Sequence, residues 1–285
     1  MYIICSLHTW CQGNSDKVLL MEKKQYFIYN FFMQNNPFEE QYQKWLNRKD
    51  KKVEKSIPHI IHHIWLGSEL PQKYVPFINS FKKFNPDWKF ILWDEKKILE
   101  LPDFKFKKEF CKISNFGTKS DIARYEILKQ YGGFYFDTDF ECLKSLDEIA
   151  DTSSFVAGLQ FYDQPGFGNA MMASAPDTFL INEILRNLKP TNSSDVMEVM
   201  RGTGPCLITD LFKDNLDKMD SSVALLPAEY FFAVPNSECT RVVEAKAEYV
   251  SDKSYAIHYW DQSWIQNDLL HRFVRKIKKF VKAKN

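Results

Sequence analysis

The sequence lacks several features that would assign its class at once. Its 285 residues hold no apolar run near the ~18 residues that a membrane-spanning helix needs. The six cysteines form no Cys-x-x-Cys pair and are widely scattered, which favours reduced thiols in a cytosolic protein. Lys+Arg (38) and Asp+Glu (37) nearly cancel, so the charge does not indicate a nucleic-acid partner. The first five residues include no basic side chain, so no secretory signal is expected.

Aromatic residues, by contrast, make up 15% of the chain. Two interpretations stay open: a Phe-rich core, or aromatic surfaces that stack on sugars and bases. The length suffices for one large α/β domain or two small ones, with a substantial core.

Residues 118–140 carry the strongest pattern, which predicts a helix, a turn and a strand that ends on two aspartates. Thr118 and Asp121 are spaced to cap the start of the helix. Gly132-Gly133 are expected to end it, because glycine tolerates the left-handed conformation that often follows a helix. The bulky aromatic residues that follow predict a strand over 134–139.

If the chain folds back at the glycines, the helix start lies beside the strand end. The predicted helix rises about 18 Å and the strand about 16–17 Å, so the two lengths match. Ser120, Asp121 and Arg124 share one helix face. They would therefore lie near Asp137 and Asp139 at the strand end. One cation, three carboxylates and the helix-end N–H groups predict a site for a divalent metal and a phosphate.

Further strands support a doubly wound, mostly parallel sheet of the α/β class. An apolar strand is predicted over 57–67, a helix over 71–84 and a second strand over 88–93. Ligands bind beyond the carboxyl ends of such strands, where Trp65 and Asp94 lie. The later elements are predicted in this order: strand 155–161, turn 166–168, strand 169–175, helix 177–188, helix 206–212, loop 225–235 and strand 255–260.

Two motifs leave alternatives open. The turn at residues 202–205, Gly-Thr-Gly-Pro, allows close approach of a ligand or simply starts a helix. His59, His62 and His63 suggest zinc, but on a strand His62 points away from the other two and no Cys or carboxylate is adjacent. A zinc site is therefore not favoured.

The flanks differ from the core in composition. Residues 1–56 are predicted to be a helical N-terminal extension, aromatic-rich over 22–46, that ends in a charged, solvated linker over 47–56. The catalytic domain is predicted over 57–268. Residues 269–285 read as a basic amphipathic helix, which is either a solvated last helix or a surface that docks on anionic lipid.

Together the motifs resemble glycosyltransferase family 32. The matching segments run from about Ile57 to Trp264 and are residues 60–67, Ser120-Asp121-x-x-Arg124, residues 132–139 and His258-x5-Trp264. This family of Asp-x-Asp (DXD) sugar-binding proteins includes relatives of yeast initiating mannosyltransferases, bacterial capsule transferases and clostridial glucosylating toxins. An isolated Asp-x-Asp would be a weak signal, whereas this combination at this spacing is strong.

The resemblance implies a GT-A type fold with one mixed, mostly parallel sheet, a Mn²⁺ or Mg²⁺ ion and a retaining reaction. It implies a catalytic group of Asp121, Arg124, Asp137 and Asp139. For the donor, the resemblance implies that Trp65 stacks on the base, that Ser120 and Asp121 contact sugar and ribose, that Arg124 lies by sugar and diphosphate, that Tyr135 lies by the ribose and that Asn169 faces the donor. It implies that Asp139 binds the metal directly, while Asp137 reaches the ribose, or the metal through water. His258, Ser263 and Trp264 match the C-terminal segment that closes over the metal and diphosphate, with His258 as a candidate third ligand.

These roles suit the chemistry of glycosyl transfer. Breaking the bond to a diphosphate develops negative charge, which a carboxylate-held divalent cation stabilises as a Lewis acid. We expect transfer of a hexose or N-acetylhexosamine from a nucleotide sugar, with UDP favoured over GDP, to a saccharide or lipid-linked acceptor. The expected setting is bacterial surface polysaccharide synthesis (capsule or lipopolysaccharide), in the cytoplasm and peripherally at the inner face of the membrane.

Three rival interpretations remain. A haloacid-dehalogenase phosphatase also places Asp-x-Asp after a strand, but it wants Thr or Val where Glu141 stands. A toxin-like effector would glycosylate a protein hydroxyl. A sugar-binding interaction protein with a relic site would have no activity.

Overall fold

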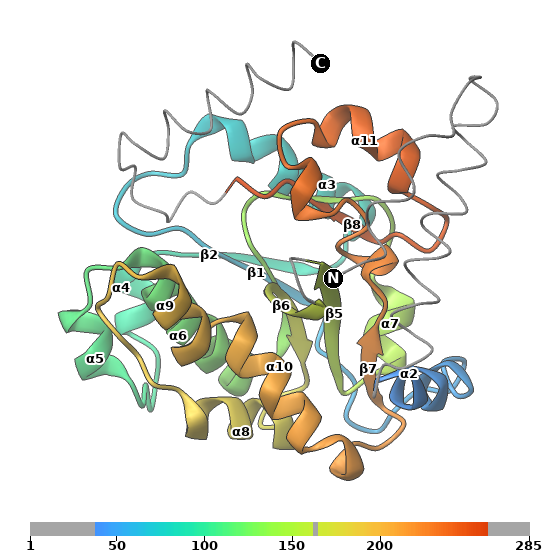
Figure 1. The fold of residues 1–285 in the computed structure, drawn as a ribbon, viewed down its shortest axis with the longest axis horizontal. Coiled ribbons are helices and arrows are strands. Elements are labelled where there is room, and N and C mark those ends of the chain that lie inside the picture. The colour runs from blue at the N-terminus through green and yellow to red at the C-terminus, as the bar shows by residue number, and fades with distance from the viewer. Residues whose placement is uncertain (1–37, 162–164, 262–285) are drawn as a thin grey trace, which may run out of the picture. The chain divides into compact units, whose positions relative to one another are not determined.

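The structure is a computed structural model, and it describes residues 38–161 and 165–261 (Figure 1). The chain divides into two compact units, Met1–Glu39 and Glu40–Asn285. The predicted basic helix at 269–285 lies outside the described residues, and so do residues 1–37 of the predicted N-terminal extension. No helix in the described ranges is both long and apolar enough to cross a bilayer.

The larger unit is built on a six-stranded sheet in the order β2-β1-β3-β6-β5-β7. Strand β6 runs antiparallel to both of its neighbours, whereas β1 is parallel to β2 and β3, and β5 is parallel to β7. The predicted mixed, mostly parallel α/β sheet is therefore confirmed. The strands are β1 (Ile60–Ile64), β2 (Lys89–Trp93), β3 (Gly133–Phe136), β5 (Phe155–Phe161), β6 (Pro165–Ser174) and β7 (Val223–Leu226), and a separate antiparallel pair is β4 (Phe140–Cys142) with β8 (Ala256–His258).

Helices flank the sheet on both sides. Figure 1 shows α6, α8, α9 and α10 on one side and α3 and α11 on the other. The helices are α2 (Glu39–Leu46), α3 (Val75–Phe84), α4 (Glu95–Leu99), α5 (Lys107–Lys112), α6 (Phe116–Tyr131), α7 (Asp147–Thr152), α8 (Phe179–Asn187), α9 (Val196–Gly202), α10 (Pro205–Asp214) and α11 (Val242–Tyr249), with short 3₁₀ turns at Gln72–Tyr74, Leu216–Lys218, Ala228–Tyr230 and Asn236–Glu238.

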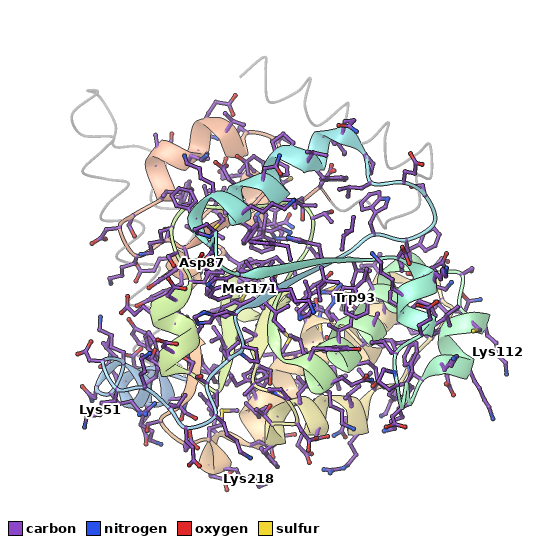
Figure 2. The ribbon with its side chains drawn as sticks, turned by 180° about the vertical axis from the view of Figure 1, so that it is seen from behind. Lys51, Asp87, Trp93, Lys112, Met171 and Lys218 are labelled. Carbon is purple, nitrogen blue, oxygen red and sulfur yellow. The ribbon has the colours of Figure 1, made fainter. Side chains whose placement is uncertain are left out.

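The sheet interior is apolar and aromatic. Figure 2 shows Trp93 and Met171 inside the domain, while Lys51, Lys112 and Lys218 project at its surface. Because β3 is the third strand of six and both of its faces are covered, all four of its residues are buried. The high aromatic content therefore builds the core to a large extent, in line with the first of the two sequence interpretations.

The strand histidines are structural. His62 accepts a hydrogen bond from Trp93 Nε1 (3.0 Å) and donates from Nε2 to the carbonyl of Gly132 (2.8 Å). His63 donates from Nδ1 to the carbonyl of Phe136 (2.9 Å). Burial lowers the pKa of each imidazole to about 4, so both stay neutral at pH 7. Neither joins the metal-binding group found among the described residues, and the zinc interpretation fails.

The hairpin at the centre of the chain differs from the prediction at both of its outer ends. Asn115, not Thr118, caps α6: its Oδ1 accepts the Thr118 N–H at 3.1 Å, and Thr118 is a buried helical residue. Strand β3 ends at Phe136, so Asp137 and Asp139 lie in the turn before β4. Asp137 still donates its N–H to the carbonyl of Ala170 on β6 (2.8 Å).

Two later predictions are also wrong, and one helix was missed. Residues 166–168 are part of β6 and do not form a turn, because β6 continues its pairing with β5 through them. Residues 223–226 form β7, although 225–235 was predicted as a loop; the apolar run pairs with β5. Helix α9 was not anticipated.

Helix α2 packs within the larger unit. Gln41 donates from Nε2 to the carbonyls of Asp220 and Val223, at 2.7 and 2.8 Å. Trp45 donates from Nε1 to Ser153 Oγ at 2.9 Å. The compact unit therefore begins at Glu40, ahead of the Ile57 boundary read from the sequence. The predicted linker also touches this unit, since Val53 donates its N–H to the carbonyl of Asp151.

Candidate functional site

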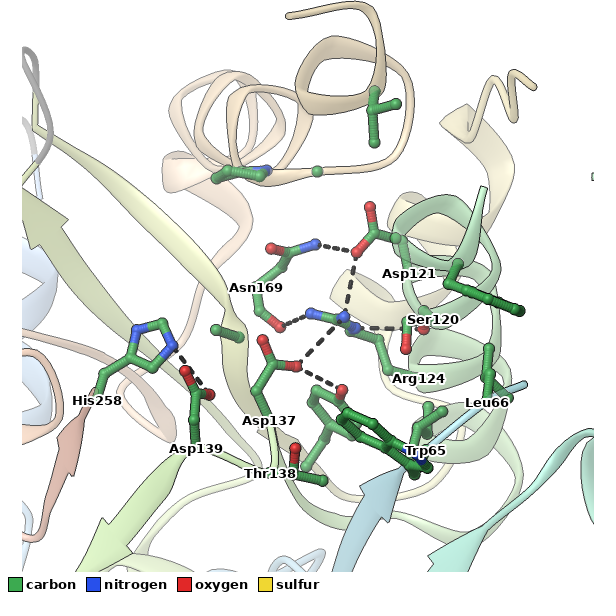
Figure 3. A pocket seen from close by; sticks show the side chains of 18 of the residues that line it. Trp65, Leu66, Ser120, Asp121, Arg124, Asp137, Thr138, Asp139, Asn169 and His258 are labelled. Carbon is green, nitrogen blue, oxygen red and sulfur yellow. Dashed lines mark hydrogen bonds and ion pairs between the residues drawn. The ribbon is translucent and has the colours of Figure 1, made fainter. Parts of the chain in front are cut away.

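A cavity of about 390 Å³ opens beyond the carboxyl ends of β1 and β3 (Figure 3). All of the predicted site residues that the structure describes line it: Trp65, Ser120, Asp121, Arg124, Tyr135, Asp137, Asp139, Asn169 and His258. Ser263 and Trp264 lie outside the described residues. Asp94, although it also follows a strand, does not line the cavity; it caps α4 by accepting the Lys97 N–H.

The two glycines between α6 and β3 make this assembly possible. Gly132 and Gly133 have φ of +63° and +94°, which side-chain-bearing residues rarely adopt. A Cβ at Gly133 would also lie 2.5 Å from the carbonyl oxygen of Ile60, and one at Gly132 would lie 2.7 Å from Pro176 Cδ. The tight reversal returns the chain along the helix and brings Arg124 beside Asp137, as the length argument predicted.

Arg124 is the buried cation of the site. Its Nη2 lies 3.2 Å from Asp121 Oδ1 and 3.4 Å from Asp137 Oδ1. Its guanidinium lies over the Tyr135 ring, 4.5 Å from the centroid, and Nη1 donates to the carbonyl of Asn169. With only 4% of Arg124 and 6% of Asp121 exposed, this is not the surface helix pair that sequence spacing alone would allow.

Asp121 ties three elements together. Its Oδ2 accepts from Thr203 Oγ1 (2.7 Å), between α9 and α10, and its Oδ1 accepts from Asn169 Nδ2 (2.8 Å) on β6. Burial raises the pKa of Asp121 to about 6, against the lowering effect of Arg124 and these donors. Both carboxylate oxygens are therefore already bonded within the protein, which gives Asp121 a positioning role for the cavity wall.

Asp137, Asp139 and His258 form a group that could hold a metal ion. One ligand atom from each lies within 4.8 Å of the other two. Asp139 Oδ1 lies 3.3 Å from His258 Nε2, and the buried Nδ1 of His258 has no hydrogen-bond partner. Tyr135 donates its hydroxyl to Asp137 Oδ1 at 2.6 Å, which fixes that carboxylate.

The charges of the site fit a divalent cation. Arg124 pairs with Asp121 and Asp137, whereas the third carboxylate, Asp139, lies against His258. Three carboxylates and one guanidinium therefore leave two negative charges in excess when all three carboxylates are ionised. Burial and the neighbouring carboxylate raise the pKa of Asp137 even though Arg124 is close. Asp139 is also buried, but the His258 imidazole and the Asp261 N–H hold its pKa below its usual range. Two carboxylates and an imidazole suit Mn²⁺ well, and Mg²⁺ less well.

The sequence did not point to the residues that surround His258. Trp260, at a φ of +57°, packs against His258 with the two rings tilted by 44° and their centroids 4.2 Å apart. Its Nε1 donates to the carbonyl of Val234. The Asp261 N–H donates to Asp139 Oδ2 (2.8 Å), and its carboxylate accepts from Tyr74 and Lys73. Asp261 and its partners Asp139, Tyr74 and Lys73 lie more than a hundred residues apart in the sequence, so no local pattern reveals these contacts.

Trp65 forms the opposite wall. Its indole packs against Tyr74 with ring centroids 5.0 Å apart and donates from Nε1 to Ser68 Oγ (3.1 Å). The side chain is half-buried, unlike the fully covered aromatics of the core, and it faces the cavity. An indole face placed in this way can stack on a planar base.

Comparisons with known proteins bear on the same segments. The family model "Glycosyltransferase sugar-binding region containing DXD motif" matches residues 71–156, and "Alpha 1,4-glycosyltransferase conserved region" matches residues 177–275. The chain is 30% identical over 190 residues to inositol phosphoceramide mannosyltransferase 1 of Schizosaccharomyces pombe, covering 64% of this chain and 59% of that protein. It is 26% identical to an uncharacterised glycosyltransferase of Acanthamoeba polyphaga mimivirus, covering 73% and 84% of the two chains.

Among solved structures, the chain is similar to the catalytic domain of the alpha-toxin from Clostridium novyi. The TM-score is 0.46 at 10% identity, over 96% of this chain and 94% of that one. Of the Schizosaccharomyces pombe mannosyltransferase named above, by contrast, the chain spans less than two thirds of the length. The family matches, together with the mixed sheet, agree with the GT-A type of fold predicted from the sequence.

Proposed function

Because this chain belongs to glycosyltransferase family 32, whose sugar-binding region contains the DXD motif, we propose that it is a metal-dependent hexosyltransferase. The donor would be a nucleotide-diphosphate sugar, and the bond from the sugar to the diphosphate would be broken. The observation that carries the proposal is the meeting of Asp137, Asp139 and His258 with the buried Arg124 in a single cavity.

A Mn²⁺ or Mg²⁺ ion held by Asp137, Asp139 and His258 would supply Lewis-acid stabilisation of the departing diphosphate. The chain's own residues then position the donor. Arg124 is buried and charged at the cavity, where it would face the sugar and the diphosphate, and Trp65 would offer a face to the base. Arg124 and Asp139 are themselves buried, and a charge that is shielded from bulk water interacts more strongly with a bound ligand.

Asp121 and Tyr135 hold the other residues of the cavity in position. Asp121 fixes Arg124, Asn169 and the turn at Thr203, so the three elements that carry them keep one geometry. Tyr135 supports both Arg124 and Asp137. With both Asp121 oxygens bonded and the Asp137 side chain turned toward Arg124, direct front-face substitution with retention suits the site better than covalent catalysis by these carboxylates.

For the acceptor we favour a lipid-linked hydroxyl over a free saccharide. The relatives named as inositol phosphoceramide mannosyltransferases support this choice, and a mannosyl group is accordingly the first donor sugar to test. UDP stays the favoured nucleotide on the family resemblance. A role in bacterial surface polysaccharide, and a peripheral position at the inner face of the membrane, stay proposals from the sequence.

The test is product formation. The protein is incubated with Mn²⁺, UDP- and GDP-hexoses and a mixture of glycolipids, saccharides and a protein lysate, and products are analysed by mass spectrometry. We expect a lipid to gain one hexosyl unit, and the product anomer to keep the donor's configuration by NMR. Gain of a hexosyl unit on a protein hydroxyl would favour the effector alternative, and no transfer from any donor would argue for the sugar-binding protein with a relic site.

A further inference from the structure

One polar side chain of the cavity has no role in the arrangement described so far. Gln160, near the end of β5, is only 4% exposed and lines the cavity. Within residues 38–161 and 165–261, no hydrogen bond engages its amide. A buried amide without a partner is costly, so one that faces a cavity is suited to a bound polar group.

The neighbouring strand, β6, leaves room for the Gln160 side chain because it has a glycine at residue 168. Gln160 pairs with Gly166 on β6, and Gly168 lies two residues further along that strand. A Cβ at Gly168 would lie 2.6 Å from Gln160 Oε1, so the amide lies directly over the glycine backbone. Two residues beyond Gly168 comes Ala170, whose carbonyl accepts the Asp137 N–H. The Gln160 amide therefore extends along β6 toward the turn that contains Asp137 and Asp139.

Gln160 approaches the cavity from the side of His258. A Cβ at Gly168 would also meet Phe232 at 2.7 Å, and the Phe232 ring lies 5.6 Å from the ring of His258. Asn169, the next residue along β6, points to the other face and bonds Asp121. A ligand in the cavity would therefore have Arg124 and Asp121 on one side and the Gln160 amide on the other.

We propose that Gln160 hydrogen-bonds a hydroxyl group of the transferred sugar and helps to select the donor hexose. An uncharged carboxamide both donates and accepts, as a sugar hydroxyl does, whereas a diphosphate is better matched by Arg124 and a cation. Sites that bond a substrate hydroxyl discriminate strongly against substrates that misplace it. This assignment rests on the proposed function.

The experiment compares binding of a nucleoside diphosphate with binding of the matching nucleotide hexose, by calorimetry with Mn²⁺. Gln160→Met keeps the length of the side chain but removes its hydrogen bonds. We expect UDP or GDP to bind the variant within twofold of wild type, while the nucleotide hexose binds about tenfold more weakly, the loss typical of one hydrogen bond. In Gln160→Met, the ratio of hydrolysis rates between two epimeric hexose donors should also move closer to one than in wild type.

The matched control is Gln41→Met, which alters a buried glutamine bonded to backbone carbonyls far from the cavity. It should lower the melting temperature and leave every affinity unchanged. Unchanged nucleotide-hexose affinity and an unchanged epimer ratio in Gln160→Met would overturn the assignment, as would an equal loss for nucleotide and nucleotide hexose. If wild type binds nucleoside diphosphates but no nucleotide hexose, the proposed function fails, and the role of Gln160 fails with it.

Discussion

Replacing Arg124 by methionine tests how the buried charges are balanced. Met fills similar space but leaves Asp121 and Asp137 without the cation that lies 3.2 and 3.4 Å from them. Removing one partner of a buried ion pair costs about 3–5 kcal/mol, since a charge is left uncompensated. We therefore expect the free energy of unfolding of Arg124→Met to fall by about that amount at pH 7.5, measured by urea denaturation.

The loss of unfolding free energy in Arg124→Met, called the deficit below, should also depend on pH in a defined direction. Burial already raises the pKa of Asp121 to about 6, above its value of 3.8 in the unfolded chain. The folded state therefore takes up this proton first as the pH falls, and stability from this group rises between pH 6 and 4. Without Arg124 the pKa rises further, and each unit is worth about 1.4 kcal/mol. The deficit of Arg124→Met should accordingly shrink by about 1–2 kcal/mol at pH 5.5.

Arg186→Met is the control, because Arg186 pairs with Glu183 at the surface with 67% of its side chain exposed. Its effect should stay below about 1 kcal/mol and show no such pH dependence. An Arg124→Met protein as stable as wild type would refute the charge balance described above. A deficit of equal size at both pH values would refute the assignment of the raised pKa to Asp121.

Three further predictions concern other parts of the molecule. In the folded protein His62 and His63 have pKa values of about 4, below the 6.5 of an unfolded histidine. The free energy of unfolding should therefore fall by about 3 kcal/mol for each as the pH drops from 6.5 to 4. In urea denaturation, His62→Gln should roughly halve this loss of stability, and an unchanged loss would contradict the prediction. His258→Gln should weaken Mn²⁺ binding, followed by electron paramagnetic resonance, by at least the 10–100-fold typical of outer-shell partners, whereas unchanged affinity would exclude His258 as a ligand. Trp65→Ala should weaken UDP or GDP binding by roughly 5–150-fold, the range for lost base stacking, while Trp65→Phe retains most of it; equal binding by all three proteins would place the base elsewhere.

The sequence predicted the part of the site that is local in the chain. The α6–β3 hairpin places Arg124 beside Asp137 because a helix and a strand of similar rise are joined by two glycines, and both facts are readable from residues 118–140. The errors at its ends have a physical cause. Asn115 competes with Thr118 for the cap, and β3 stops at Phe136 because its pairing with β6 ends there.

What the sequence could not predict depends on partners far apart in the chain. The contact of Asp261 with Asp139, and of Tyr74 with Asp261, joins segments that no spacing rule connects. The same holds for the contact between Thr203 and Asp121. The Gly-Thr-Gly-Pro turn allowed either close approach of a ligand or a helix start, and neither interpretation named Asp121 as a partner. Gln160 carried no signal in a strand of ordinary composition, and only the missing side chain at Gly168 shows where its amide lies.

The most direct test of the proposed function is nucleoside diphosphate release from a panel of UDP- and GDP-hexoses. It is measured with Mn²⁺, with Mg²⁺ and with a chelator, for wild type and for Asp139→Asn. We predict that wild type hydrolyses at least one donor when a divalent ion is present and that the chelator abolishes release. The Asp139→Asn protein, folded by circular dichroism, should release almost none. Release that persists in Asp139→Asn or with the chelator would contradict the proposal, as would a panel in which wild type turns over no donor.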